Sequence, residues 1–193
     1  WLVLALLAPA AKGEEISQQF NYEDWISRWE AQTGEVVTPS AKETALKAIA
    51  MEFSSTASAA GISRDDSSMV ALAIEDAGDF SVSPKGVIAK SEAGEVRFTW
   101  NNAQFAAIAN TLNPELVSLQ LEPLPIVTVV VDPAPPIDYL IEINGERVRT
   151  TDKGRYRVDI GDVVVLVTRA SRQDCLWRGN LKAREEQQVA CKL

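Results

Sequence analysis

Apolar residues in the first half of the chain recur every three or four positions, which is the spacing of one face of an α-helix. Residues that cap helices stand before two of these runs, at Asn21 and Thr38, and Gly34 is placed to end the first run. The pattern predicts helices over residues 16–32, 38–60, 63–77 and 101–112.

Strand-like runs are few in the first half of the chain and dominate the second half. Residues 86–90 and 95–100 interrupt the helical pattern, and the loop between them has hairpin length. Beyond Pro123 helical spacing ends, β-branched residues dominate, and Asn144-Gly145 gives a strong hairpin signal. We therefore predict an α+β protein: a helical region with a small β-hairpin, followed by an antiparallel β-sandwich of about seven short strands.

The first residues resemble an export signal. An apolar run at 1–7 is followed by Ala8-Pro9-Ala10, a small-x-small pattern that signal peptidase accepts. We interpret residues 1–11 as a signal-peptide remnant or the end of an uncleaved membrane anchor, residues 12–122 as a mainly helical domain, and residues 123–193 as the β-sandwich domain. Either interpretation of the first segment predicts a secreted or periplasmic protein that contacts a membrane only through this segment, if it is uncleaved.

The chain has two cysteines, Cys175 and Cys191. In an oxidising compartment two cysteines most often pair, whereas zinc wants four ligands and this chain has no histidine. If residues 175–193 form a hairpin with Cys175 opposite Cys191, then Trp177 lies opposite Val189, so the cysteine and apolar registers agree. We predict a disulfide that closes a C-terminal hairpin; two free thiols are the alternative.

Charge and composition exclude several classes of function. The 27 acidic and 19 basic side chains give a net charge of −8, which argues against nucleic acid as a partner. Without histidine, Ser-His-Asp and Cys-His catalytic sites cannot form, and no glycine-rich phosphate loop is present. We expect no enzyme activity, no cofactor and no metal.

Clustered carboxylates leave one catalytic alternative open. Glycoside hydrolysis requires only two carboxyl groups at a set separation. The densest group is Glu75, Asp76 and Asp79, which Asp65 and Asp66 could join, and such oxygen ligands also suit calcium. Acids near helix ends are more often solvated surface, which is the interpretation we favour.

Basic residues alternate on two predicted strands, at Arg147, Arg149, Arg155 and Arg157. A hairpin register would set Arg149 against Arg155 and Arg147 against Arg157, and facing like charges are destabilising unless something offsets them. An anionic ligand would offset them. Neutralisation within the chain would do so as well, with Glu142 opposite Arg147 and the acidic helical half covering the rest.

Trp25 and Trp29 lie one turn apart on the first predicted helix. Their aromatic stripe is either a partner or sugar surface, or the face by which the helix packs on the core.

The segment from 126 to 193 resembles the PEGA-type family of small extracytoplasmic β-sandwiches found in bacterial envelope proteins. The resemblance is carried by INGE at 143–146, VDIGD at 158–162 and the strand that follows, at 163–168. The family's Gly-Tyr element and namesake tetrapeptide are absent here. The resemblance implies an adhesive or scaffolding envelope module without catalytic residues.

Together these observations predict a non-catalytic binding or scaffolding protein of the cell envelope. Its partner would be an envelope protein or an anionic envelope component, bound through the four arginines, with Trp25 and Trp29 adding apolar contact. The alternative is a carbohydrate-active module that binds glycan through the tryptophans or cleaves it with carboxylates such as Glu75 and Asp79.

Overall fold

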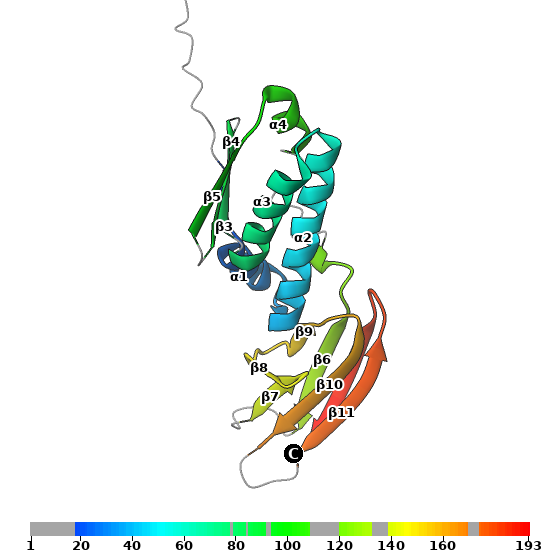
Figure 1. The fold of residues 1–193 in the computed structure, drawn as a ribbon. Coiled ribbons are helices and arrows are strands. Elements are labelled where there is room, and N and C mark those ends of the chain that lie inside the picture. Colours follow the sequence, from blue (N-terminus) through cyan, green and yellow to red (C-terminus); the bar gives the residue numbers. More distant parts are fainter. Residues whose placement is uncertain are drawn as a thin grey trace, which may run out of the picture.

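The computed structural model describes residues 18–77, 79–83, 85–91, 94–108, 120–132, 139–169 and 174–193. The predicted signal remnant at 1–11 lies outside these residues. Within them, no helix is long and apolar enough to cross a membrane. Figure 1 shows the helices gathered at one end of the molecule, while the strands that follow residue 125 lie at the other end.

Four of the predicted helices are present, as α1 (Tyr22–Thr33), α2 (Pro39–Ala59), α3 (Arg64–Ala77) and α4 (Asn102–Ile108). Residues 109–112, predicted as the end of the last helix, lie outside the described residues. The Asn21 side chain caps α1 by accepting a hydrogen bond from the Asp24 amide at 2.9 Å. Thr38 caps α2 in the same way, and Gly34, with a φ of 70°, ends α1 in the left-handed conformation that glycine adopts without strain.

One four-stranded sheet belongs to the helical part. It consists of β1 (Gln18–Asn21), β3 (Asp79–Ser83), β4 (Gly86–Ser91) and β5 (Gly94–Thr99), in that order and antiparallel throughout. The β4–β5 pair is the predicted hairpin. Strand β1 occupies the described start of the 16–32 segment, and helix α1 begins directly after the predicted cap at Asn21. Ile26, Phe53, Ile74 and Val87 are buried in one cluster that joins this sheet to the helices.

The remaining strands form two more sheets. The first is antiparallel and contains β11 (Cys175–Leu181), β10 (Gly161–Thr168), β7 (Leu140–Ile143) and β8 (Glu146–Val148) in that order. The second contains β12 (Glu186–Lys192), β6 (Ile126–Asp132), β9 (Arg155–Arg157) and β2 (Val36–Val37). Alternating residues of both sheets, such as Val127, Ile143, Val165 and Val189, are buried in one shared cluster.

The second of these sheets is mixed, so the prediction of purely antiparallel pairing is wrong for it. Strand β12 runs parallel to β6, and β2 runs parallel to β9. The first parallel pair arises because the chain crosses from one sheet to the other between β11 and β12 instead of folding back within one sheet. The second arises because β2 comes from the helical region, before residue 123.

The predicted pairing of the arginine strands is also wrong. Strand β8 pairs with β7 and strand β9 pairs with β6, so Arg147 and Arg149 do not face Arg157 and Arg155. The turn at Asn144 and Gly145, with φ values of 53° and 82°, places β8 on β7. The following turn then carries the chain to the other sheet.

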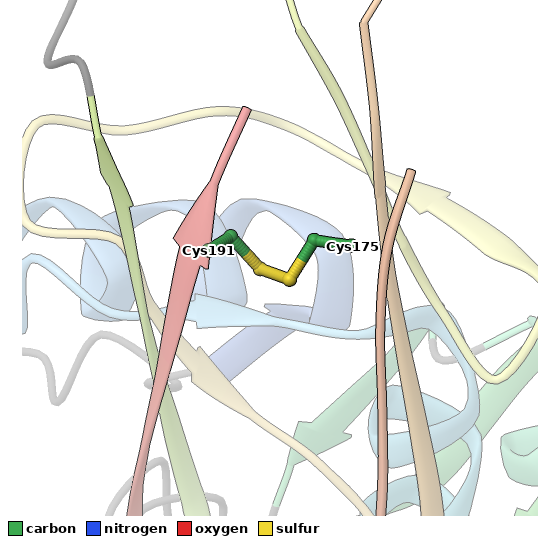
Figure 2. The surroundings of a disulfide bond; sticks show 2 residues. All are labelled: Cys175 and Cys191. Carbon is green, nitrogen blue, oxygen red and sulfur yellow. A yellow bond between two sulfur atoms is a disulfide. The ribbon is translucent and has the colours of Figure 1, made fainter. Parts of the chain in front are cut away.

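The predicted disulfide is present, with the two Cα atoms 5.6 Å apart. It does not close a hairpin. Figure 2 shows Cys175 and Cys191 reaching toward each other from separate strands, and β11 and β12 belong to different sheets. The expected pairing of Trp177 with Val189 is therefore wrong. Trp177 lies opposite Val165, and the disulfide links the two sheets across their common core.

Candidate functional site

The structure divides the four candidate arginines into two pairs. Arg155 and Arg157 lie on β9, which pairs with β2 from the helical region. Arg157 Nε donates to a Glu35 carboxylate oxygen at 2.6 Å, and Arg155 donates to the other oxygen at 3.1 Å. Glu35 is buried, and these two guanidinium groups compensate its negative charge.

Arg157 makes several further contacts in the same place. Its Nη1 atom donates to the backbone carbonyls of Leu121, Glu122 and Leu124 at 3.2, 3.1 and 2.8 Å. Its guanidinium lies 5.6 Å from the centre of the Trp29 ring, within cation–π range. Arg157 therefore holds two parts of the chain against β9. One is helix α1, through Trp29, and the other is segment 121–124, which precedes β6. We call Trp29, Glu35, Arg155 and Arg157 the joint.

Arg147 and Arg149 lie outside the joint and are exposed. Arg149 makes one ion pair, with Glu30 at 3.3 Å, and its side chain is 68% exposed. Arg147 is opposite Glu142 in the β7–β8 register but has no ion-pair partner among the residues that the structure describes. These two guanidinium groups are the accessible part of the predicted cluster.

A pocket of about 550 Å³ contains both exposed arginines. We call it the arginine pocket; it is lined by Tyr139, Leu140, Arg147, Val148, Arg149, Thr150 and Thr168. Guanidinium groups bind carboxylates and phosphates through charge-assisted hydrogen bonds, and hydroxyl groups can donate to the same oxygens. The lining therefore has the chemistry of a site for an anionic group.

Tyr156 is buried beside this region. Burial raises the pKa of its hydroxyl to about 12, and the nearby Tyr139 acts in the same direction. The hydroxyl lies near the Thr151 backbone but makes no hydrogen bond of good geometry within the described residues. It stays neutral at ordinary pH and supplies no negative charge to the arginine pocket.

The two tryptophans pack against the helical core. Trp29 is 8% exposed and is covered by Arg157, and Trp25 is partly buried against the same core cluster. This is the packing interpretation of the aromatic stripe. Trp29 presents no surface for a partner or a sugar ring.

The candidate carboxylates do not form a site within the described residues. Asp65 and Asp76 are exposed, Glu75 is partly buried, and the side chain of Asp79 lies outside the described part of the chain. No group of three metal-ligating side chains occurs there. A pocket of about 340 Å³ beside α2 is lined by Glu23, Glu43 and Asp76, and Glu75 is not among the described residues that line it.

Two kinds of residue in these sites were not found from sequence. Glu35 was missed, although a lone acid directly before the apolar pair Val36-Val37 is a signal for a buried charge with a partner. Tyr139, Thr150 and Thr168 were missed because nothing in a local pattern brings the ends of three strands together.

Comparisons with known proteins add no assignment. No family model matches the chain, and no curated protein matches it.

Proposed function

We propose that this chain is a non-catalytic binding or scaffolding protein of the bacterial cell envelope, secreted or periplasmic. In this proposal the arginine pocket captures an anionic group on an envelope partner, most simply an acidic surface of another protein. The observation that carries the proposal is the pair of exposed guanidinium groups in one pocket, in a chain whose other two clustered arginines are used internally.

The envelope location is supported by the disulfide, because disulfides persist in oxidising compartments. It is supported as well by the signal-like pattern at 1–11 and by the resemblance to PEGA-type domains. We interpret the two sheets formed mainly by residues beyond 123, with β2 at one edge and one shared core, as a β-sandwich domain.

The test reverses the two exposed charges. The Arg147→Glu/Arg149→Glu chain should capture the partner from solubilised native envelope at least about tenfold less well than wild type, because attraction becomes repulsion at the same place. Its free energy of unfolding should fall by about 1–3 kcal/mol, because Arg149 is exposed but its partner Glu30 is only 11% exposed and would face a second carboxylate. Circular dichroism should show that the variant remains folded.

The matched control is Lys182→Glu/Lys192→Glu, which changes the net charge equally at exposed positions outside the arginine pocket. This control should capture the partner as wild type does. Equal capture by wild type and the Arg147→Glu/Arg149→Glu chain would overturn the proposal. Arg155 is unsuitable for this test, because its reversal would place a second carboxylate beside buried Glu35.

The carbohydrate-active alternative has no comparable support. Trp29 is buried in the joint, and Glu75 lines neither of the two pockets among the described residues. We do not carry it further.

A further inference from the structure

Strand β12 is an edge strand of the β12-β6-β9-β2 sheet, and among the described strands only β6 bonds to it. Along this parallel pair the Ile126 amide donates to the Glu185 carbonyl, and the Leu193 amide donates to the Asp132 carbonyl. Because alternate residues of a strand bond to the same neighbour, the odd-numbered residues of β12 bond to β6, and the even-numbered ones direct their backbone groups away from it. These outward-facing residues are Glu186, Gln188, Ala190 and Lys192.

The β12 edge is long, regular and firmly held. With seven residues each, β12 and β11 are the longest edge strands of the described sheets. Strand β12 contains no proline, keeps one register with β6 over its whole length, and is tied to the other sheet by the disulfide at Cys191. The Gln188 carbonyl accepts a hydrogen bond from the Gln187 side chain at 2.7 Å, but a carbonyl oxygen can accept two. Such a row of N–H and C=O groups is a template for another strand.

The side chains of this edge are complementary to a second copy of the same edge. Glu186 and Lys192 are both exposed, and they stand at equal distances along the strand on either side of Val189. When two β12 strands lie antiparallel with their Val189 residues opposite each other, Glu186 of each copy faces Lys192 of the other, and Gln188 faces Ala190. This register pairs all the outward-facing residues, whereas a shift by two residues leaves one of them in each copy without an opposite residue. Opposite charges directly across from each other stabilise a strand pair.

The charges further into the sheet agree with this register. Glu186 lies 3.5 Å from Arg155 of its own chain, and Lys192 is beside Asp132 in the β12–β6 register. Across the junction the signs therefore alternate, from Arg155 through Glu186 to Lys192 and Asp132 of the second copy. The basic residues of the turn at 182–185 precede β12 and lie outside the paired residues.

Strand β11, the other long edge, lacks this complementarity. Val164 directs its backbone groups toward Asn144, because its carbonyl accepts from the Asn144 amide and its own amide donates to the Asn144 side chain, both at 2.8 Å. Arg178 is opposite Val164, so its backbone groups, with those of Leu176 and Asn180, point to the outer edge of β11. The fullest antiparallel pairing of two β11 strands would set Arg178 against Arg178, and facing like charges are destabilising. Charge therefore favours β12 over β11.

We propose that two copies of this chain pair through β12, in the antiparallel register centred on Val189, to form a twofold dimer. The pairing joins the two β12-β6-β9-β2 sheets into one continuous sheet, with a Glu186–Lys192 contact near each end of the paired strands. Because the same edge of each copy is used, the association closes at two copies. The inference goes beyond the proposed function, and the strands of the arginine pocket belong to the other sheet, outside this interface.

Sedimentation of the purified chain over a range of concentrations tests the charge pairing. Wild type should form a dimer and nothing larger. Lys192→Glu sets two carboxylates against each other, and Glu186→Lys sets two ammonium groups against each other, so each variant alone should dimerise at least about tenfold more weakly. An equimolar mixture of the two should dimerise again, and so should the Glu186→Lys/Lys192→Glu chain, because every facing pair is once more of opposite sign.

Amide hydrogen exchange of wild type, read residue by residue, tests the backbone pairing without any substitution. The amides of Gln188 and Ala190 should exchange more slowly in the dimer than in the monomer reached by dilution, because only the dimer gives them a bonded neighbour. The amides of Val189 and Cys191 should change less, since they are bonded to β6 in both states.

The matched control is Arg64→Glu, which changes the net charge as Lys192→Glu does, at an exposed position of α3. It should dimerise as wild type does, and circular dichroism should show that every variant is folded. A monomeric wild type, species larger than a dimer, single variants that dimerise as wild type does, or a mixture that stays monomeric would each overturn the inference. A dimer whose Gln188 and Ala190 amides exchange as in the monomer would overturn it as well.

One variant separates this inference from the proposed function. The Lys182→Glu/Lys192→Glu chain should be monomeric at concentrations where wild type is dimeric, and it should still capture the envelope partner, because each copy has its own arginine pocket. Loss of capture by the Arg147→Glu/Arg149→Glu chain, with its dimer intact, reports on the proposed function alone.

Discussion

The arginines of β8 and β9 differ in what surrounds their guanidinium groups. Arg157 is 12% exposed and has a carboxylate, three carbonyls and an aromatic ring as neighbours, whereas Arg149 has one ion pair and is 68% exposed. A buried guanidinium that loses its carboxylate keeps its desolvation cost, while an exposed one is solvated by water. The same residue type therefore stabilises the fold at one position and is available for binding at the other.

Glu35→Gln tests the residue that holds the joint. It removes the charge facing Arg155 and Arg157, so we expect the free energy of unfolding in urea to fall by about 3 kcal/mol. The matched control is Glu23→Gln, which removes one half of an exposed pair with Lys42 and should cost less than about 1 kcal/mol. Equal small losses for both variants would contradict a structural role for the joint.

Tyr156 makes stability depend on alkaline pH. Its pKa is about 12 in the folded protein and about 10 in an unfolded chain, so the folded state holds this proton more tightly. Its contribution to stability is complete below about pH 10 and is lost as pH rises toward 12. The free energy of unfolding of wild type should therefore decline over this interval.

The Tyr156→Phe variant checks this pH dependence. The free energy of unfolding of this variant should decline less steeply between pH 10 and 12 than that of wild type. Some decline should remain, because burial also raises the pKa of Tyr22. At neutral pH the variant should be at least as stable as wild type, because the hydroxyl it removes has no good hydrogen bond among the described residues. Identical alkaline slopes for the two proteins would contradict the assignment.

At the scale of elements, alternation determines which face a side chain occupies but not which strand lies beside it. Cys175 and Cys191 both point to the core, so sequence indicated correctly that they meet, although their strands belong to different sheets. The arginine register failed for the same reason. Helices were easier to predict, because caps such as Asn21 and ends such as Gly34 act within a few residues.

The disulfide should stabilise the folded chain by linking the two sheets of the β-sandwich. Removing it with Cys175→Ala/Cys191→Ala should lower the free energy of unfolding by about 3 kcal/mol, from the closure of the intervening loop. Reductant should lower the stability of wild type by a similar amount and leave the variant unchanged. A wild type whose unfolding is indifferent to reductant would contradict this role.

At the scale of the whole molecule, contacts across residue 123 hold the helical part and the β-sandwich part together. Dividing the chain at residue 123 does not reveal these contacts. Strand β2 and Glu35 lie before residue 123, yet they pair with β9 and its arginines. Charge had indicated this arrangement in outline, since residues 1–136 carry 8 basic and 18 acidic side chains and the remainder carry 11 and 9. Which acid meets which base could not be predicted, because it depends on the fold of both parts.

The central claim is that the arginine pocket, and not the joint, meets the partner. Amide hydrogen exchange of the wild-type chain, alone and saturated with the partner it captures, tests this most directly. We expect new protection over residues 139–150 and at Thr168, with the amides of β9 unchanged because they are already held within the molecule. Protection that leaves residues 139–150 unchanged and appears elsewhere would contradict the account.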